Sequence, residues 1–378
     1  MPEQDRNPRG PARTPHEKPR SRPAARTSLE SSTGAPISYL SGIMEHRPKP
    51  EFFHILKTQQ FDRALLDELC ELTTAIRKFA KTKEGLLYLR GLLAHKRAML
   101  YFTQPSTRTF LSFNNACQIL GIQTSEIRDS STSSEVKGES LLDSLRTFSS
   151  YVDVVVMRTK EEGLAESAAD LFDTIQRRVP IINAGSGKDQ HPTQALLDIY
   201  TLERSFKEMG GIDGKTIAMM GDLKRGRTVR SLCYLMKNYR DVKLVFIAPD
   251  DFAMAEDIKK SLIAHGVDFH ETKDLRSVLP QLDAIYITRI QDEHDQAGES
   301  KRVDISAFKF GVEHLKLMKP EGVIMHPLPR RDEIHPDVDS DPRAKYWRQE
   351  RNGMWMRVAI FLKLFKVDHL VMHGHLLD

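Results

Sequence analysis

The chain has 378 residues, 40% of them hydrophobic, and its 56 Lys and Arg against 52 Asp and Glu leave a formal net charge of +4. This length predicts about two or three domains, and so small a charge argues against a nucleic-acid-binding surface. The three cysteines, Cys70, Cys117 and Cys233, lie far apart, which argues against a disulfide framework or a zinc site and indicates a reducing, cytoplasmic setting. No apolar run is long enough to span a membrane, and no signal-peptide core follows the first residues.

Residues 1–48 are rich in Pro, Arg and Ser and poor in large apolar residues. Such a segment buries too little surface to order itself, so we expect a disordered basic tail. Its arginines leave an organelle transit peptide as the alternative, against which Glu3, Asp5, Glu17 and the many prolines speak.

The next predicted elements surround the segment Ser106-Thr107-Arg108-Thr109. Before it, Asp62 is placed to cap a helix with a leucine-rich face, and the apolar run from Ala98 predicts a buried strand that ends before Pro105. After it, apolar residues recur at helical spacing over Leu111–Ile119. The segment should therefore begin a helix, where free N–H groups, hydroxyls and a guanidinium suit a phosphate. The alternative is an ordinary helix cap followed by a solvated arginine.

The rest of the chain alternates between apolar strands and helical segments. This alternation is typical of parallel α/β folds, whose strands are covered on both faces. We therefore predict an α/β fold of two parallel-sheet domains, over residues 49–195 and 196–352, with a site between them and a C-terminal helix within 353–378 that packs back on the first domain. The predicted strands are Val152–Met157, Val179–Asn183, Thr216–Met220, Leu244–Ile247, Ala284–Ile287 and Val323–Met325, with helices from about Pro192 and over Gly353–Phe365.

Polar and cationic residues follow these strands at their carboxyl ends, where parallel sheets bind ligands. Taken singly, a lone arginine there is usually a surface cation and a lone histidine is usually structural. Five such loops together predict one site for a polyanion between the two domains. Neither a complete dinucleotide fingerprint nor a P-loop is present. The residues are Arg158; Asn183 and Gly185–Gly187 with His191 and Gln194; Gly221–Arg227; Thr288, Arg289, Gln291 and Glu293; and His326–Arg330.

Five motifs, taken as a set, closely resemble the catalytic chain of the aspartate carbamoyltransferase family, within the aspartate/ornithine carbamoyltransferase superfamily. The match keeps the same order from about Phe52 to the C-terminus, and it is specific as a set although each motif alone is weak. The motifs are Ser106-Thr107-Arg108-Thr109, His191-Pro192-Thr193-Gln194, Gly221–Lys224 with Gly226-Arg227-Thr228, Arg289–Glu293 and His326–Arg330.

The resemblance implies an enzyme that transfers the carbamoyl group of carbamoyl phosphate to the amine of L-aspartate, giving N-carbamoyl-L-aspartate and phosphate, an early step of pyrimidine biosynthesis. It calls for no metal, nucleotide or organic cofactor, and for no nucleic acid or membrane partner. Carbamoyl phosphate would be held by Ser106, Thr107, Arg108, Thr109, Arg158, His191, Gln194, Leu328 and Pro329, the last two joined by a cis peptide bond, and aspartate by Lys137, Arg227, Arg289 and Gln291.

Within that set, the resemblance gives each group a task. Thr109, Arg158 and His191 would donate to the carbamoyl oxygen. Gln194 would accept from the carbamoyl NH₂. We expect His191 to act as an electrophile rather than a base, with the departing phosphate taking the amine proton.

The polar loop around Ser133 and Lys137 would, by the same resemblance, complete the site of a neighbouring subunit, which makes a homotrimer with shared active sites necessary for activity. A regulatory chain could bind as well. Without the resemblance, this stretch reads as an exposed mobile loop.

Four positions depart from the family's usual residues: Gln104 stands for Glu, Phe110 for Arg, Val136 for Lys and His294 for Arg. The first and last family residues help to link the two domains in the closed state. We therefore hypothesise that domain closure depends less on a salt link in this chain.

Two other functions compete with this interpretation. A carbamoyltransferase for ornithine shares the phosphate-binding motifs, but a cationic amine would gain nothing from Arg227 and Arg289. An inactive scaffold paralogue is the second alternative, and the intact ligand-binding positions argue against it.

Overall fold

The structure is a computed structural model, and it describes residues 52–129, 138–187, 190–291 and 306–373. The predicted tail over residues 1–48 lies outside these ranges. No helix among the described residues has the length and apolar character needed to cross a membrane.

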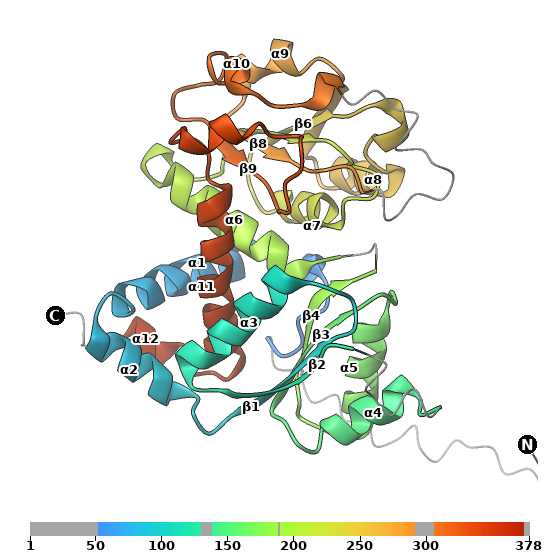
Figure 1. The fold of residues 1–378 in the computed structure, drawn as a ribbon, viewed down its shortest axis with the longest axis vertical. Coiled ribbons are helices and arrows are strands. Elements are labelled where there is room, and N and C mark those ends of the chain that lie inside the picture. The colour runs from blue at the N-terminus through green and yellow to red at the C-terminus, as the bar shows by residue number, and fades with distance from the viewer. Residues whose placement is uncertain (1–51, 130–137, 188–189, 292–305, 374–378) are drawn as a thin grey trace, which may run out of the picture. The chain divides into compact units, whose positions relative to one another are not determined.

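The first half of the chain forms a four-stranded sheet in which every pair of neighbours is parallel (Figure 1). The strand order is β2-β1-β3-β4. Parallel pairing requires a crossover after each strand, and helices supply it. The strands are β1 (Arg97–Phe102), β2 (Gln123–Ile127), β3 (Val154–Thr159) and β4 (Ile181–Ser186), and the connecting helices are α3 (Thr107–Leu120), α4 (Leu141–Phe148) and α5 (Leu164–Thr174).

The second half forms a five-stranded sheet, again with parallel neighbours only, in the order β7-β6-β5-β8-β9. Its strands are β5 (Thr216–Met220), β6 (Lys243–Ile247), β7 (Asp268–Thr272), β8 (Ala284–Ile287) and β9 (Val323–Met325), and its helices include α7 (Arg227–Met236), α8 (Glu256–Ala264), α9 (Leu275–Val278) and α10 (Val312–Leu315). The two sheets confirm the predicted α/β class.

Two long helices run between the sheets: α6 (Pro192–Phe206) and α11 (Tyr346–Leu364), which pack against each other (Figure 1). α11 also packs against α3 and against α1 (Arg63–Phe79), beside which lie α2 (Lys83–Leu92) and α12 (His369–Met372). The predicted cap of α1 is confirmed, because the Asp62 carboxylate accepts from the Leu65 N–H at 2.9 Å.

Alternation along each strand divides the core into three clusters. Leu100 of β1 and Met219 of β5 belong to one large cluster with α6 and α11, whereas their neighbours Tyr101 and Met220 belong to separate clusters on the outer face of each sheet. Successive strand residues point to opposite faces, so both faces of both sheets are covered. One hydrophobic core is therefore shared by the two sheets, which fixes them around α6 and α11.

The structure differs from the predicted elements mainly at edges and ends. The edge strands β2 and β7 were not predicted, because most of their residues are exposed and polar and lack an apolar signal. β3 and β4 each begin and end two or three residues later than predicted, so Arg158 lies inside a strand rather than after it. α11 begins at Tyr346 rather than Gly353. The sequence did not indicate this earlier start, because the first turns expose residues such as Trp347.

Candidate active site

A cavity of about 520 Å³ opens at the carboxyl ends of strands from both sheets. Strand ends β1 and β3 supply one side, β5, β8 and β9 supply the other, and the starts of α3, α6 and α7 border it. The predicted residues that line it are Arg108, Thr109, Arg158, His191, Gln194, Arg227, Thr288, Arg289, Gln291, His326, Pro327, Leu328 and Pro329. The fold thus brings together side chains separated by more than 200 positions in the sequence.

Helix α3 begins at the segment Ser106-Thr107-Arg108-Thr109, where the sequence predicts a helix start. Ser106 is the N-cap residue, yet its side chain makes no capping hydrogen bond, and Arg108 and Thr109 line the cavity one turn further on. Ser106 and Thr107 adjoin these two and are not among the lining residues. The unbonded N–H groups of a helix start and its positive partial charge favour an anion at this end.

Arg158 and His191 approach each other closely because the residue between them is a glycine. Gly185 has φ +112°, and a Cβ at this position would lie 2.7 Å from Arg158 Nη1 and 3.2 Å from His191 Cδ2. Arg158 Nη1 donates to the Ala184 carbonyl at 3.1 Å. Only a residue without a side chain permits this packing.

Burial and neighbouring cations set the charge of these two groups. Burial first, and then the charges of Arg227, Arg357 and Arg108, hold the pKa of Arg158 well below its usual range. Burial together with the nearby arginines likewise holds the pKa of His191 well below its usual range. The imidazole is therefore neutral near pH 7 and can donate one N–H to a ligand oxygen.

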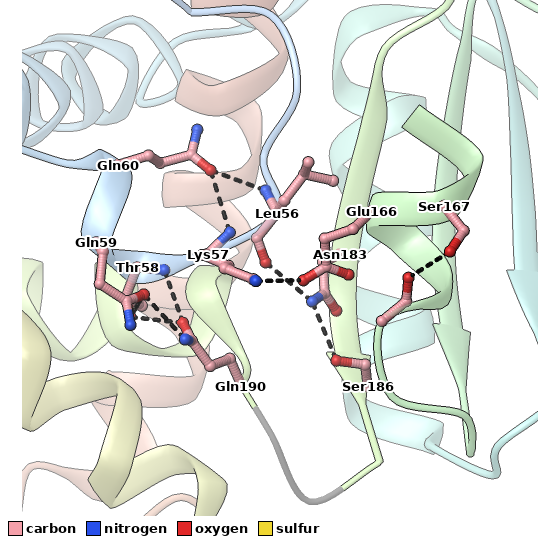
Figure 2. A network of polar contacts seen from close by, with 11 residues as sticks. Leu56, Lys57, Thr58, Gln59, Gln60, Glu166, Ser167, Asn183, Ser186 and Gln190 are labelled. Atoms are coloured by element: carbon pink, nitrogen blue, oxygen red, sulfur yellow. Dashed lines mark hydrogen bonds and ion pairs between the residues drawn. The ribbon is translucent and has the colours of Figure 1, made fainter. Parts of the chain in front are cut away.

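A polar network joins the segment before α1 to Asn183 and Gln190 (Figure 2). Thr58 donates to Gln190 Oε1 through its backbone N–H at 2.8 Å and its hydroxyl at 2.7 Å, which fixes the residue before His191. Asn183 donates to the Leu56 carbonyl at 3.0 Å and accepts from the Gly185 N–H at 2.8 Å. The segment before α1 therefore contacts Asn183, two residues before Gly185, and Gln190, directly before His191.

Gln194 is oriented by a buried carboxyl group that the sequence analysis did not single out. Its Nε2 donates to Asp198 Oδ1 at 3.0 Å, so its Oε1 is left to accept from a ligand. Asp198 also accepts from Gln349 at 2.7 Å and from Tyr286 at 2.9 Å. Burial raises the pKa of Asp198 to about 8. The only available sequence signal was its spacing of four from Gln194 on one helix face.

The second sheet presents Arg227 and Arg289. Arg227 Nη1 donates to Gln104 Oε1 at 3.1 Å and to the Gly187 carbonyl at 2.6 Å, so it reaches across to loops of the first sheet. The buried carboxylate of Asp222 accepts from the Gln291 N–H at 3.2 Å, which ties the turn after β5 to the segment that carries Arg289. Gln104, one of the four residues that differ from the family's usual ones, thus contacts Arg227 as a neutral partner. Two others, His294 and Val136, lie outside the described residues.

The turn after β9 is held by a buried histidine. The Leu328 N–H donates to His326 Nδ1 at 2.7 Å, so the imidazole proton lies on Nε2, which donates to Glu333 at 2.6 Å. The His326 backbone N–H donates to Gln349 Oε1 at 3.0 Å. The Leu328–Pro329 peptide bond is cis, as predicted.

Helix α11 adds two charged residues that were not predicted, because they lie on a helix and not at a strand end. Arg357 lines the cavity, donates to Ser112 at 2.6 Å and has its pKa lowered to about 10 by burial. Glu350 also lines the cavity, and burial raises the pKa of its carboxyl group. Among the residues that the structure describes, six arginines therefore border the cavity against one carboxyl group.

Two of the predicted site residues, Ser133 and Lys137, lie outside the described residues. Over the described ranges, no cluster of three His, Cys, Asp or Glu side chains has the arrangement of a metal site. An excess of arginines around a small polar cavity suits a ligand with several negative charges.

Comparison with known protein families agrees with this geometry. Residues 54–204 match the aspartate/ornithine carbamoyltransferase carbamoyl-P binding domain, and residues 213–364 match the Asp/Orn binding domain of the same family. The chain therefore belongs to the aspartate/ornithine carbamoyltransferase family, and within it to the aspartate carbamoyltransferases.

Individual relatives come from distant organisms. The chain is 43% identical over 312 residues to aspartate carbamoyltransferase 1 (chloroplastic) of Pisum sativum, covering 81% of this chain and 77% of the pea protein. It is 40% identical over 306 residues to the aspartate carbamoyltransferase catalytic subunit of Thermococcus gammatolerans, covering 81% and 95%. The structure resembles aspartate transcarbamoylase from Trypanosoma cruzi in complex with carbamoyl phosphate and aspartate, with a TM-score of 0.74, 36% identity and coverage of 82% and 95%.

Proposed function

We propose that this chain catalyses carbamoyl transfer from carbamoyl phosphate to L-aspartate, giving N-carbamoyl-L-aspartate and phosphate, an early step of pyrimidine biosynthesis. The observation that carries the proposal is that Arg108 and Arg158 of the first half of the chain and Arg227 and Arg289 of the second half line one cavity. Two anionic substrates repel each other, and arginines on both sides offset that repulsion. Holding the two reactants together in this way accounts for about 7–11 kcal/mol of a typical barrier.

The phosphate group would be bound at the start of α3, by Ser106, Thr107, Arg108 and Thr109, with Arg158 completing the set. This assignment is supported by the helix N-terminus at Ser106 and by the position of Arg108 and Thr109 on the cavity wall. Arg357 would add a further positive charge from α11.

The carbamoyl oxygen would accept from Thr109, Arg158 and His191, and these contacts strengthen as negative charge develops on it. One such donor is typically worth about 2.7–4 kcal/mol of transition-state stabilisation. A neutral His191 suits this task, because it donates without being able to lose a proton to solvent at neutral pH. Gln194 Oε1 and the Leu328 carbonyl would accept from the carbamoyl NH₂.

The aspartate carboxylates would be bound by Arg227 and Arg289, with Gln291 assisting. A guanidinium fork matches a carboxylate through two parallel hydrogen bonds. In the reaction, the aspartate amine attacks the carbamoyl carbon, the C–N bond forms and the bond from carbon to the phosphate oxygen breaks. The leaving phosphate takes the amine proton, so no side-chain base is needed.

The active form would be a homotrimer in which Ser133 and Lys137 of one subunit complete the site of the next, and a regulatory chain could associate with it. We place the protein in the cytoplasm because tail residues 1–48 have the acidic and proline content that disfavours a transit peptide, in contrast to the plant relatives, which are named chloroplastic. Cell fractionation of the full chain beside a variant that lacks residues 1–48 tests the location; recovery of the full chain in an organelle fraction would refute it.

The decisive experiment measures ureido product formed by the purified full chain from carbamoyl phosphate, with L-aspartate and L-ornithine offered separately. We expect product with aspartate only. Arg289→Ala should raise KM for aspartate by about a hundredfold, which corresponds to one charged hydrogen-bonded contact of about 1.5–3 kcal/mol, whereas Arg276→Ala, at an exposed arginine of the same half, should not. Product from ornithine, or from neither amine, would contradict the proposal.

A further inference from the structure

A second cavity, of about 410 Å³, lies where α1, α6 and α11 meet, and its lining residues are different from those of the active site. Asn352 lines it and is held in place, because its Nδ2 donates to the Thr201 hydroxyl at 3.0 Å. The other lining groups are mostly cations: Arg77 near the end of α1, Arg204 near the end of α6, and Lys345, Arg348 and Arg351 at the start of α11.

The charge of this cavity is not balanced by its own walls. No carboxyl group is among the described residues that line it. Burial is the main cause that lowers the pKa of Arg77, and the charges of Arg204 and Arg351 add to it. Burial likewise lowers the pKa of Lys345, and the charge of Arg348 adds to it. Arg77 donates to Asn352 Oδ1 at 2.5 Å, and Lys345 donates to the Pro342 carbonyl at 2.5 Å, both neutral acceptors. The nearby Asp341 is occupied by a two-pronged pair with Arg343.

The start of α11 adds to this imbalance. A helix N-terminus carries a positive partial charge and usually has acidic residues and a capping side chain. The first turn of α11 has no acidic residue, and its N-cap residue, Lys345, makes no side-chain capping bond. Arg348 and Arg351 follow within the next two turns on the cavity side. An anion bound here would meet both the cations and the helix end.

We propose that this cavity is a binding site for a small polyphosphate anion. Arginine forks bind phosphate oxygens through paired hydrogen bonds, and the three exposed arginines, Arg204, Arg348 and Arg351, can adjust to a flexible phosphate chain. The two half-buried cations, Arg77 and Lys345, form the inner end of the site. A cavity of this volume admits a diphosphate or triphosphate group and excludes a folded partner, so a small ligand fits it better than a protein surface does.

Calorimetric titration of the full chain with inorganic tripolyphosphate tests this site, with the active site first filled by a saturating bisubstrate analogue. We expect one binding event per chain, weakened by added salt because the contacts are ionic. The variant Arg348→Gln with Arg351→Gln should bind about a hundredfold more weakly, since each arginine contributes about tenfold. The matched control Arg90→Gln with Arg276→Gln removes the same charge from exposed positions elsewhere and should bind as the wild type does.

Equal weakening by the control pair would show that tripolyphosphate responds only to net charge and would overturn the proposal. The proposal is also refuted if no titratable binding remains once the active site is filled. The two substituted arginines are exposed, so loss of folding is not expected; an unchanged thermal transition without ligand verifies this. Binding is measured without turnover, so failure of the site and failure of the proposed enzyme activity are distinguishable.

Discussion

Substitution of Asp198 should reduce the enzyme's preference for binding carbamoyl phosphate over acetyl phosphate. In the structure Asp198 Oδ1 accepts a hydrogen bond from Gln194 Nε2 at 3.0 Å, and the Gln194 oxygen, which we propose accepts from the carbamoyl NH₂, points away from this contact as the other atom of the amide. Acetyl phosphate carries a methyl group in place of that NH₂ and serves as the probe. We expect Asp198→Leu to let the Gln194 amide turn, so that selectivity for carbamoyl phosphate over acetyl phosphate falls about tenfold, the value of one neutral hydrogen bond.

The conservative variant separates orientation from charge. Burial raises the pKa of Asp198 to about 8, so the group is largely protonated at pH 7, and Asp198→Asn reproduces that neutral form with its oxygen toward Gln194. Asp198→Asn should therefore keep the selectivity. Asp198→Leu leaves three buried donors without an acceptor, at about 1–2 kcal/mol each, and should lower the free energy of unfolding by about 3–6 kcal/mol.

The assay compares the KM for carbamoyl phosphate with the inhibition constant of acetyl phosphate, because both ligands carry the same phosphate and general loosening affects them alike. Tyr286→Phe removes one partner of Asp198 without touching Gln194 and is the matched control. In a Gln194→Ala background, Asp198→Leu should have no further effect on the ratio. A folded Asp198→Leu protein with wild-type selectivity would refute the reasoning.

Three further predictions concern the site. Mixing inactive Arg108→Ala and Lys137→Ala chains and allowing subunits to exchange should restore about a quarter of wild-type activity if each site is shared between neighbours in a trimer, and no recovery would exclude sharing. The folded chain holds the pKa of His191 well below 6.5, so only the unfolded chain gains this proton as pH falls below about 6.5. The free energy of unfolding should therefore drop by up to about 1.4 kcal/mol per pH unit from this group. Urea unfolding of His191→Gln should lack that contribution, and a pH profile of stability identical to that of the wild type would contradict the prediction. Gly185→Ala would place a Cβ 2.7 Å from Arg158 Nη1 and should raise the KM for carbamoyl phosphate. The control Gly210→Ala, at φ +83° with open space, should cost only about 1–3 kcal/mol of stability. Equal kinetics in the two variants would argue against the packing role of Gly185.

The sequence determined the class of fold and most of the polar residues around the cavity. Buried parallel strands such as β5 and β8 are continuous apolar runs, so Thr216–Met220 and Ala284–Ile287 were predicted with their observed bounds. Loops that follow such strands collect at one edge of a sheet, which is why the sequence alone predicts a common site for Arg227 and Arg289.

Only the tertiary structure decided how the two sheets share one core and which helix residues reach the cavity. Asp198, Glu350 and Arg357 lie on helices α6 and α11, where local sequence indicates a buried face but not what that face meets. The edge strand β7 has little apolar signal and is defined by its pairing with β6. Contacts between distant parts of the chain, such as the bond between Gln349 and Asp198, depend on the packing of whole elements, and no local pattern of residues encodes that packing.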